Sequence, residues 1–531
     1  MASFLQSIGY HSWVLPALLI LPTLGALVVW AHGRSLKGAS DDHMEAGAMM
    51  ARRLTFGILV LEFIISAGLW WSFDASSAAF QATVDWPWID SWGVTFALGI
   101  DGLSLMMVLL TTFLMPLAIL GGWTSVRHKV HTYHVLMLLL TVGMLGVFVA
   151  RDLFLFYVMW EVMLIPMYFI VGLWGGERRI YASIKFFIYT MVGSLLMLIA
   201  IVYLGWQAGL LEGKPNFAYD AIMALPEFTP MVSFWLFCAF FIAFAVKVPM
   251  FPFHTWLPDA HVEAPTAGSV ILAGVLLKLG TYGFLRLAVP LFPAIALHPM
   301  VRGVIIGLAV IGVIYGSLVA LVQPDFKKLV AYSSVAHLGM VMLGIFAMTR
   351  ESVQGALMVM IGHGVSTGAL FFLIGMIYER KHSRIIADYG GIAKVVPIYA
   401  TLLTVVALSS IGLPGTNGFI SEFLVMVGSF KTVPVATTFS ALGVILAAAY
   451  LLWALQRILY NPLDKPANEQ LTDLNWREIG LMAPLVFMIL WMGIYPTPVL
   501  SRMEASVGHF VQQVEAKAAA QSVTLTMGGG N

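Results

Sequence analysis

The stretch K-V-P-M-F-P-F-H-T-W-L-P-D-A-H-V-E-A-P, residues 247–265, interrupts a strongly apolar segment with a lysine and four prolines. Proline lacks a backbone donor and clashes with the preceding helical turn, so we expect the helix over 231–246 to end near Lys247. In a lipid bilayer, freed backbone groups persist only where protein or a water-filled cavity receives them. The stretch therefore predicts a broken helix beside an internal hydrophilic path.

The composition is that of a membrane protein. The chain has 531 residues, 60% hydrophobic and 10% charged, whereas a soluble chain carries about 25% charged residues. Its single cysteine, Cys238, excludes a disulfide framework and a cysteine-based iron–sulfur or zinc site within this chain. We find no phosphate-binding loop or dinucleotide glycine fingerprint, and the net charge of +1 gives no sign of a nucleic-acid partner. The sequence predicts an all-α polytopic membrane protein.

Fourteen apolar segments reach the ~20 residues that a helix needs to span a bilayer. They cover roughly 13–31, 53–71, 101–122, 133–150, 153–174, 180–204, 231–249, 268–290, 303–322, 329–347, 354–378, 396–428, 434–460 and 479–496. The twelfth is too long for one straight span and contains L-P-G-T-N-G at 413–418. We therefore expect a second broken helix there. No signal peptide is recognisable before the first segment, so we expect that helix to be retained.

Most lysines and arginines lie in the loops that follow odd-numbered segments. Positive residues concentrate on the cytoplasmic side of membrane proteins, so this asymmetry supports fourteen spans and places both termini outside the cytoplasm.

The spacing of polar residues indicates an internal repeat. Lys247 follows Glu161 by 86 residues, and Glu422 follows His337 by 85 residues. We predict two five-helix repeats, 133–290 (helices 4–8) and 291–460 (helices 9–13), preceded by helices 1–3 in 1–132 and followed by helix 14 and a tail in 461–531. An odd number of helices per repeat inverts the second copy, as in many ion transporters.

Ionisable side chains recur near mid-membrane. Each costs about 2.5–3.5 kcal/mol at the helix centre, so such residues face the protein interior and find partners. A glutamate and a lysine that approach and separate shift each other's proton affinity, and histidine titrates near neutrality. We therefore predict a proton relay. Glu62 also lies near mid-membrane, but its role stays open. The relay residues are Glu161, Lys247, Lys278, His337, His363 and Glu422.

Simpler interpretations stay open for several of these residues. Glu161 and Lys247 could form a static ion pair. His337 and His363 could be neutral core histidines. In another functional interpretation they are the two axial ligands of a haem. Glu62 could be a packing or partner contact.

Other polar residues near the spans have structural interpretations as well. Asp101 could be a helix N-cap, and Lys185 could approach Glu161. The four residues His254, Asp259, His261 and Glu263 resemble a metal set, but the prolines between them fix no shared helical face. No metal site is expected.

Long motifs in fixed order resemble those of the antiporter-like subunits of respiratory complex I, the NADH:quinone oxidoreductase. They are W-E-V-M-L-I-P-M-Y at 160–168, W-G-G at 174–176, residues 247–265 quoted above, and A-G-S-V-I-L-A-G-V-L-L-K-L-G at 267–280. The A-H-V-E-A-P ending resembles the M type best. The acid Glu422 also resembles the M type, because the L and N types would carry lysine at this position. The resemblance covers essentially the whole chain.

The resemblance implies a proton-translocating subunit in a bacterial plasma membrane, between L-type and N-type neighbours. It implies that Glu161 and Lys247 are the coupled acid and base of the input half, Lys278 the central transfer residue and Glu422 the exit residue. It places His337 and His363 on the connecting water path. FMN, iron–sulfur clusters and quinone are then expected in partner subunits, with no cofactor in this chain. After the last segment we expect no long lateral helix of the kind expected of the L subunit, which agrees with the M type.

Three rival functions remain. The D-type subunit of multi-subunit Na⁺/H⁺ antiporters shares this fold and the Glu–Lys pair. The others are a redox module that binds quinone or haem itself, and a purely structural scaffold for a pump.

Overall fold

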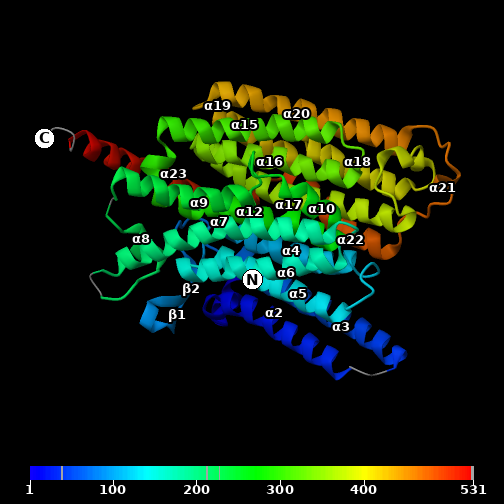
Figure 1. Cartoon of the computed structure of the whole chain (residues 1–531), viewed down its shortest axis with the longest axis horizontal. Coiled ribbons are helices and arrows are strands. Elements are labelled where there is room, and N and C mark those ends of the chain that lie inside the picture. Colours follow the sequence, from blue (N-terminus) through cyan, green and yellow to red (C-terminus); the bar gives the residue numbers. More distant parts are fainter. Residues whose placement is uncertain (37–39, 211–212, 227, 528–531) are drawn as a thin grey trace.

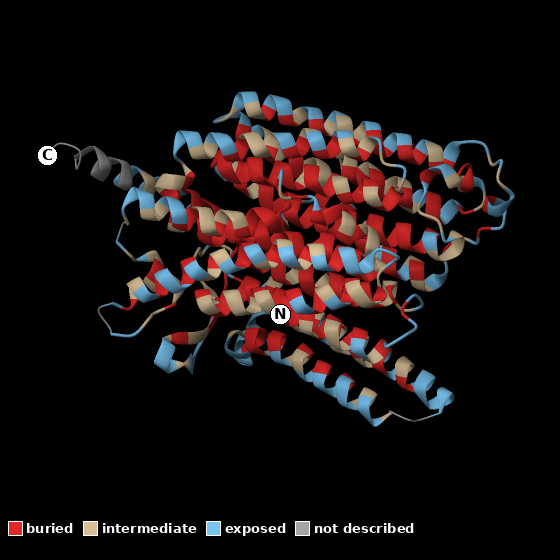
Figure 2. Ribbon diagram, viewed as in Figure 1, coloured by how far each residue is buried: buried red, intermediate tan, exposed pale blue. Residues whose placement is uncertain are grey.

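The computed structural model describes residues 1–36, 40–210, 213–226 and 228–527. Its helices run side by side along the length of the molecule (Figure 1). Buried residues concentrate in the central helices, while the outer helices expose one face (Figure 2). That outer face is apolar, with exposed side chains such as Ile64, Ile199 and Ile445. An apolar surface of this extent fits lipid rather than water.

The predicted segments coincide with helices. Twelve helices of the described chain are long and apolar enough to cross a membrane. They are α2 (Tyr10–Ser35), α3 (Asp41–Ser72), α5 (Val130–Val149), α6 (Leu153–Trp174), α7 (Arg179–Ala208), α9 (Pro230–Lys247), the segment Thr266–Leu291, α15 (Pro299–Leu321), α16 (Phe326–Ala347), α17 (Arg350–Lys381), α20 (Pro434–Leu455) continued by η6 (Gln456–Tyr460), and α22 (Trp476–Ile494). The predicted all-α membrane class is confirmed.

The other two predicted segments form shorter helices. They are α4 (Leu105–Gly121) and the pair α18 (Pro397–Ile411) and α19 (Asn417–Phe430). The count of fourteen spans therefore stays a prediction, as does the division into two inverted repeats.

The first predicted break lies where the prolines stand. Helix α9 ends at Lys247, and helical structure resumes only at α10 (Trp256–Glu263). The indole Nε1 of Trp256 donates to the carbonyl of Val246 at 2.9 Å. This bond satisfies one carbonyl that the end of α9 leaves free. A cation at a helix carboxyl end is also favoured by the helix dipole, which explains why this end tolerates Lys247.

The second break joins α18 to α19. Gly412 ends α18 in the left-handed region at φ 87°, a conformation that costs other residues about 1–2 kcal/mol. A Cβ on Gly412 would lie 3.6 Å from Oε2 of Glu422. The glycine thus both ends the helix and lets the chain approach this carboxyl group closely.

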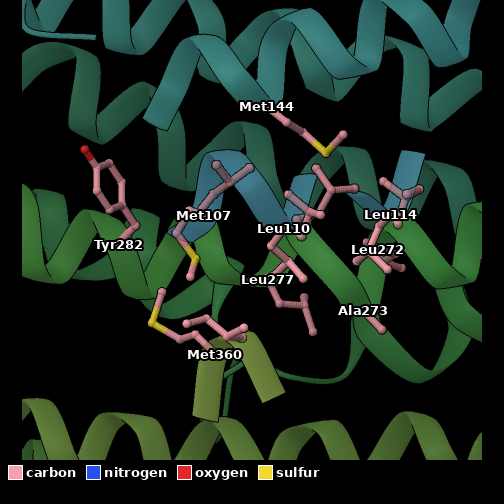
Figure 3. Packing of buried hydrophobic residues seen from close by; sticks show 14 of the residues in the cluster. Met107, Leu110, Leu114, Met144, Leu272, Ala273, Leu277, Tyr282 and Met360 are labelled. Atoms are coloured by element: carbon pink, nitrogen blue, oxygen red, sulfur yellow. The ribbon is translucent and has the colours of Figure 1, made fainter. Parts of the chain in front are cut away.

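The segment Thr266–Leu291 lies at the centre of the molecule and is buried at every position from Ala267 to Pro290. It consists of α11 (Thr266–Ile271), the π-helical turn η2 (Leu272–Leu276), α12 (Leu277–Gly283), the π-helical turn η3 (Phe284–Ala288) and α13 (Val289–Leu291). Leucine and methionine side chains of α4, α5 and α17 pack around it (Figure 3). Single π-helical turns inside α-helices are frequent at functional sites.

Two elements were not predicted. An antiparallel hairpin, β1 (Gln81–Ile89) with β2 (Val94–Ile100), precedes α4. The expected C-terminal tail contains the long helix α23 (Thr497–Met527). Its buried residues Val499, Met503 and Val507 recur every four positions, a helical period that could have revealed it. The helix packs against α13, α14 and α17.

The remaining short elements lie in the connections. They are α1 (Ala2–Ser7), η1 (Asp90–Trp92), α8 (Tyr219–Met223), α14 (Pro293–Ala296), η4 (Ile386–Asp388), η5 (Ile392–Lys394) and α21 (Pro466–Glu469).

Candidate functional site

Glu422 and His337 are in direct contact. Glu422 lies on α19 soon after the second break, and His337 lies in the middle of α16. Nδ1 of His337 is 2.8 Å from Oε1 of Glu422. Glu422 is 7% exposed, so the imidazole is the partner that a carboxyl group at this depth requires.

Lys278 and His363 form a second contact. Lys278 is fully buried on α12, and its Nζ lies 2.7 Å from Nδ1 of His363 on α17. The same Nζ donates to the carbonyl of Ala273, which belongs to the π-helical turn η2. The two acceptors hold the lysine head group in place without a carboxylate.

The two histidines connect these contacts. The rings of His337 and His363 meet edge to face, with centroids 5.6 Å apart and planes at 63°. Lys278, His363, His337 and Glu422 thus form one continuous series from the central helix to the second break. The sequence predicted these four residues but not which of them touch.

Lys247 lies in an aromatic enclosure at the first break. It is 1% exposed, and its Nζ lies 5.5 Å from the centroid of the Trp160 ring and 5.4 Å from that of Phe186. Ring faces attract a cation, by about 2 kcal/mol or more where the site is desolvated. The enclosure therefore accommodates a lysine in either charge state.

Glu161 stands apart from Lys247. It lies on α6, partly exposed, facing Ser194 of α7. No ion pair or hydrogen bond within the described residues joins its carboxylate to Lys247, and Oε1 of Glu161 is buried without a partner. Charge–charge interaction still couples the two groups. The static ion pair that the sequence left open does not form in this structure.

Lys185 pairs with Asp259, whereas the sequence suggested that it could approach Glu161. Its Nζ lies 2.8 Å from Oδ2 of Asp259, which belongs to α10. This pair ties α7 to the short helix after the first break. Lys185 is thereby occupied away from Glu161.

The suspected metal set does not converge. The ring of His261 stacks on Phe371 with centroids 4.6 Å apart, and the ring of His254 stacks on Phe251. Asp259 is paired with Lys185. Within the described residues no group of three or more His, Cys, Asp or Glu side chains could hold a metal ion.

Asp101 is both a turn residue and an ion-pair partner. Its Oδ1 accepts from the backbone nitrogens of Leu103 and Ser104, consistent with a cap-like role just before α4. The same atom lies 2.6 Å from Nη2 of Arg286, and both side chains are buried. Arg286 lies within the predicted span 268–290, where the sequence alone gave it no role.

Glu62 lies outside the series. It is fully buried on α3, and both carboxyl oxygens lack partners within the part of the chain that is described.

Polar uncharged residues around the second break were missed. Asn417, Ser366 and Ser409 are buried and bonded to one another beside Glu422 and His363. Serines inside apolar helices give no charge signal, so only their position at the break could have indicated them.

Comparisons with known proteins identify the family of the chain. Residues 150–448 match the model of the family described as NADH:quinone oxidoreductase/Mrp antiporter, TM. The NADH-quinone oxidoreductase subunit M of Rhodobacter capsulatus is 44% identical over 95% of this chain and 97% of its own length. The NADH-ubiquinone oxidoreductase chain 4 of Arabidopsis thaliana is 43% identical over 85% and 90%.

A solved structure shows the same fold. One chain of respiratory complex I from Thermus thermophilus superposes with a TM-score of 0.83, at 32% identity, covering 94% of this chain and 99% of that one. The relative from Rhodobacter capsulatus and the solved structure match nearly the whole sequence, and the family model matches its central part, residues 150–448. The chain therefore belongs to the NADH:quinone oxidoreductase/Mrp antiporter transmembrane family, on the branch of the M subunits of complex I.

Proposed function

We propose that this chain is the proton-translocating M-type subunit in the membrane arm of a bacterial NADH:quinone oxidoreductase. The observation that carries the proposal is the continuous series Lys278–His363–His337–Glu422 inside the bundle. Each member can hold or release a proton, and neighbours in the series touch. A scaffold would gain nothing from four such groups in lipid, each of which disfavours insertion.

The input half works through Lys247. Its aromatic enclosure stabilises the ammonium form, while burial favours the neutral amine. Movement of the half-buried Glu161 toward or away from Lys247 would change that balance. The charge state of Lys247 would then set the proton affinity of Lys278 on α12, which packs against α9.

The redox chemistry lies elsewhere. FMN, iron–sulfur clusters and quinone belong to partner subunits, and energy reaches this chain through its neighbours. Those neighbours are the L-type and N-type antiporter-like subunits. As part of the assembled enzyme, the chain contributes the translocase activity.

The test compares two buried glutamates. Glu422→Gln keeps the shape and hydrogen-bonding capacity of Glu422 but removes its titration, whereas Glu62→Gln makes the same change outside the series. In inverted membrane vesicles, NADH-driven proton uptake should fall by about tenfold or more in Glu422→Gln and stay near the parent rate in Glu62→Gln. Normal proton uptake by assembled Glu422→Gln would refute the proposed function.

The Na⁺/H⁺ antiporter remains the second candidate, because the matching family model covers both classes. The relatives at 44% identity are named as NADH-quinone oxidoreductase subunits, which favours the first candidate. Co-purification of this chain with NADH-oxidising subunits distinguishes the two.

A further inference from the structure

An apolar groove lies between α3, α4, α17 and α22, outside the relay. It has a volume of about 470 Å³, within the range of about 300–1,000 Å³ of sites that bind small molecules. The side chains that line it are apolar throughout, among them Phe63, Met106 and Trp491. Two of its lining residues, Trp71 and Phe487, are 51% and 63% exposed. The groove therefore opens onto the outer apolar surface of the bundle.

The groove has the length of one leaflet of a bilayer. Its lining on α3 runs from Phe63 to Trp71, which is about 12 Å at ~1.5 Å per residue. Half of the hydrocarbon core of a bilayer is about 15 Å. Phe63 lies next to Glu62, near mid-membrane, and Trp71 lies next to the end of α3 at Ser72. The groove thus extends from one membrane interface to the middle of the bilayer, as a single acyl chain does.

Two tryptophans mark the outer end of the groove. The rings of Trp70 and Trp491 meet there, with centroids 5.8 Å apart. Each residue lies within one turn of the end of its helix, α3 or α22. Tryptophan is enriched at the membrane–water interface, at the depth of the lipid head groups. A chain bound in the groove would therefore have its polar end beside Trp70.

Arg502 of α23 lies at that end. Its guanidinium carbon is 3.6 Å from the centroid of the Trp70 ring. Its Nε and Nη2 donate to the carbonyl of Trp70, and its Nη1 donates to the carbonyl of Pro498. A guanidinium has five N–H donors, so two remain. No acidic side chain of the described residues forms an ion pair with Arg502, and the site therefore has a positive charge to offer an anion.

We propose that this groove binds one acyl chain of a phospholipid, whose phosphate group is held by Arg502. Arginine is suited to phosphate, because its planar donors match two phosphate oxygens. A quinone fits less well, since its head group needs polar partners and the described lining has no acid, amide, hydroxyl or imidazole side chain. The inference goes beyond the proposed function and does not depend on it.

The bound chain would pack against the helix that carries His363. Ile361 and Val365 line the groove and lie four positions apart, on one face of α17. His363 stands between them in sequence and so points to the other side of the helix. The lipid would thus support α17 from behind the relay.

The experiment uses the assembled enzyme, purified in detergent and incubated with phosphatidylglycerol that carries a photoreactive diazirine in the middle of one acyl chain. The sample is washed with detergent and irradiated, and the adducts are mapped by peptide mass spectrometry. We expect labelling of Met488, which lines the groove, to survive washing. Labelling of Ile64, which is 62% exposed on α3 and lies outside the groove, should fall to background.

Two changes remove the site by different means. Ala67→Phe places a ring in the groove, and we expect labelling of Met488 to fall by about tenfold, because a filled volume excludes the chain. Gly57→Phe is the matched control on the same helix, since a Cβ at Gly57 meets no atom within 4 Å, and should label as the parent does. Arg502→Gln keeps a donor for the Trp70 carbonyl but removes the charge, and should also lose about tenfold, whereas Arg502→Lys should stay within about threefold of the parent.

Each contrary outcome overturns the proposal. Labelling of Met488 that washes out together with that of Ile64 would show no bound lipid, and so would parent-like labelling in Ala67→Phe. Parent-like labelling in Arg502→Gln would show that the phosphate lies elsewhere. Displacement of the label by a short-chain quinone at lower concentration than by unlabelled phosphatidylglycerol would assign the groove to quinone.

Discussion

At the scale of single residues, the two buried lysines of the relay have rings and a carbonyl as partners, and no carboxylate of the described residues forms an ion pair with either. Lys278 has an imidazole and a carbonyl, and Lys247 has two aromatic rings. A fixed carboxylate partner would hold a lysine in its charged form. Partners of this kind leave both charge states accessible, as a proton carrier requires.

This arrangement predicts that His363 and Lys278 depend on each other. His363→Phe removes the imidazole acceptor of a buried ammonium, and breaking a buried charged contact on one side costs about 3–5 kcal/mol. We expect a lower melting temperature of the purified complex. Lys278→Met added to the same chain should restore most of the loss, because no charge is then left unpaired. Equal or greater destabilisation of the double variant would contradict this account of Lys278.

At the scale of elements, the two broken helices bring the polar groups into place by different means. The first break has prolines and ends at Lys247. The second has Gly412 in the left-handed region and Asn417 at the start of α19. In both, a side chain satisfies a backbone carbonyl at the break: Trp256 bonds to the carbonyl of Val246 at the first, and Thr416 bonds to the carbonyl of Leu413 at the second.

The second break predicts a glycine requirement. Gly412→Ala should destabilise the chain by about 1–2 kcal/mol, because alanine is strained at a positive φ. It should also lower proton uptake, since the added Cβ lies near the Glu422 carboxyl. Gly307→Ala on α15 meets no atom within 4 Å and should be neutral or slightly stabilising. Thermal unfolding of the two purified complexes checks this, and equal melting temperatures would be the contrary result.

Sequence reasoning found the elements better than the contacts. Prolines and the L-P-G-T-N-G motif marked both breaks, because a broken helix has a strong local signature. The apolar runs marked the membrane helices for the same reason. The partners of Lys185 and of Asp101 were not predictable, since both bonds join segments far apart in the chain. The serine and asparagine cluster was missed because uncharged polar residues are common in membrane helices as packing groups.

At the scale of the whole molecule, the relay lies inside an apolar shell with a polar end on each side. The hairpin and α8 lie at one end of the bundle, and the loop containing α21 lies at the other (Figure 1). Lysine and arginine concentrate in the loops at the α21 end, which we assign to the cytoplasm. A proton that follows the relay would therefore travel through the centre of the bundle between its two solvent-exposed ends.

The assignment of the ends can be tested with cysteine reporters. Cys238 is the only cysteine of this chain, so Cys238→Ala leaves the chain without a thiol, and labelling is read on this chain after it is separated from its partner subunits. A membrane-impermeant maleimide added to spheroplasts should label Ser77→Cys, which precedes β1, and should leave Asp464→Cys unlabelled until the membrane is opened. The reverse pattern would show that the orientation is wrong.

The most direct test of the central claim is a double-variant cycle on proton uptake, with Lys278→Met, Glu422→Gln and both together in the assembled enzyme. When two groups act in one series, the effects of their variants on the rate are not additive, because removing either group blocks the transfer of the same proton. We predict that the double variant takes up protons no more slowly than the slower single variant. Rate losses that multiply would show that Lys278 and Glu422 act independently, and would contradict a single relay through this chain.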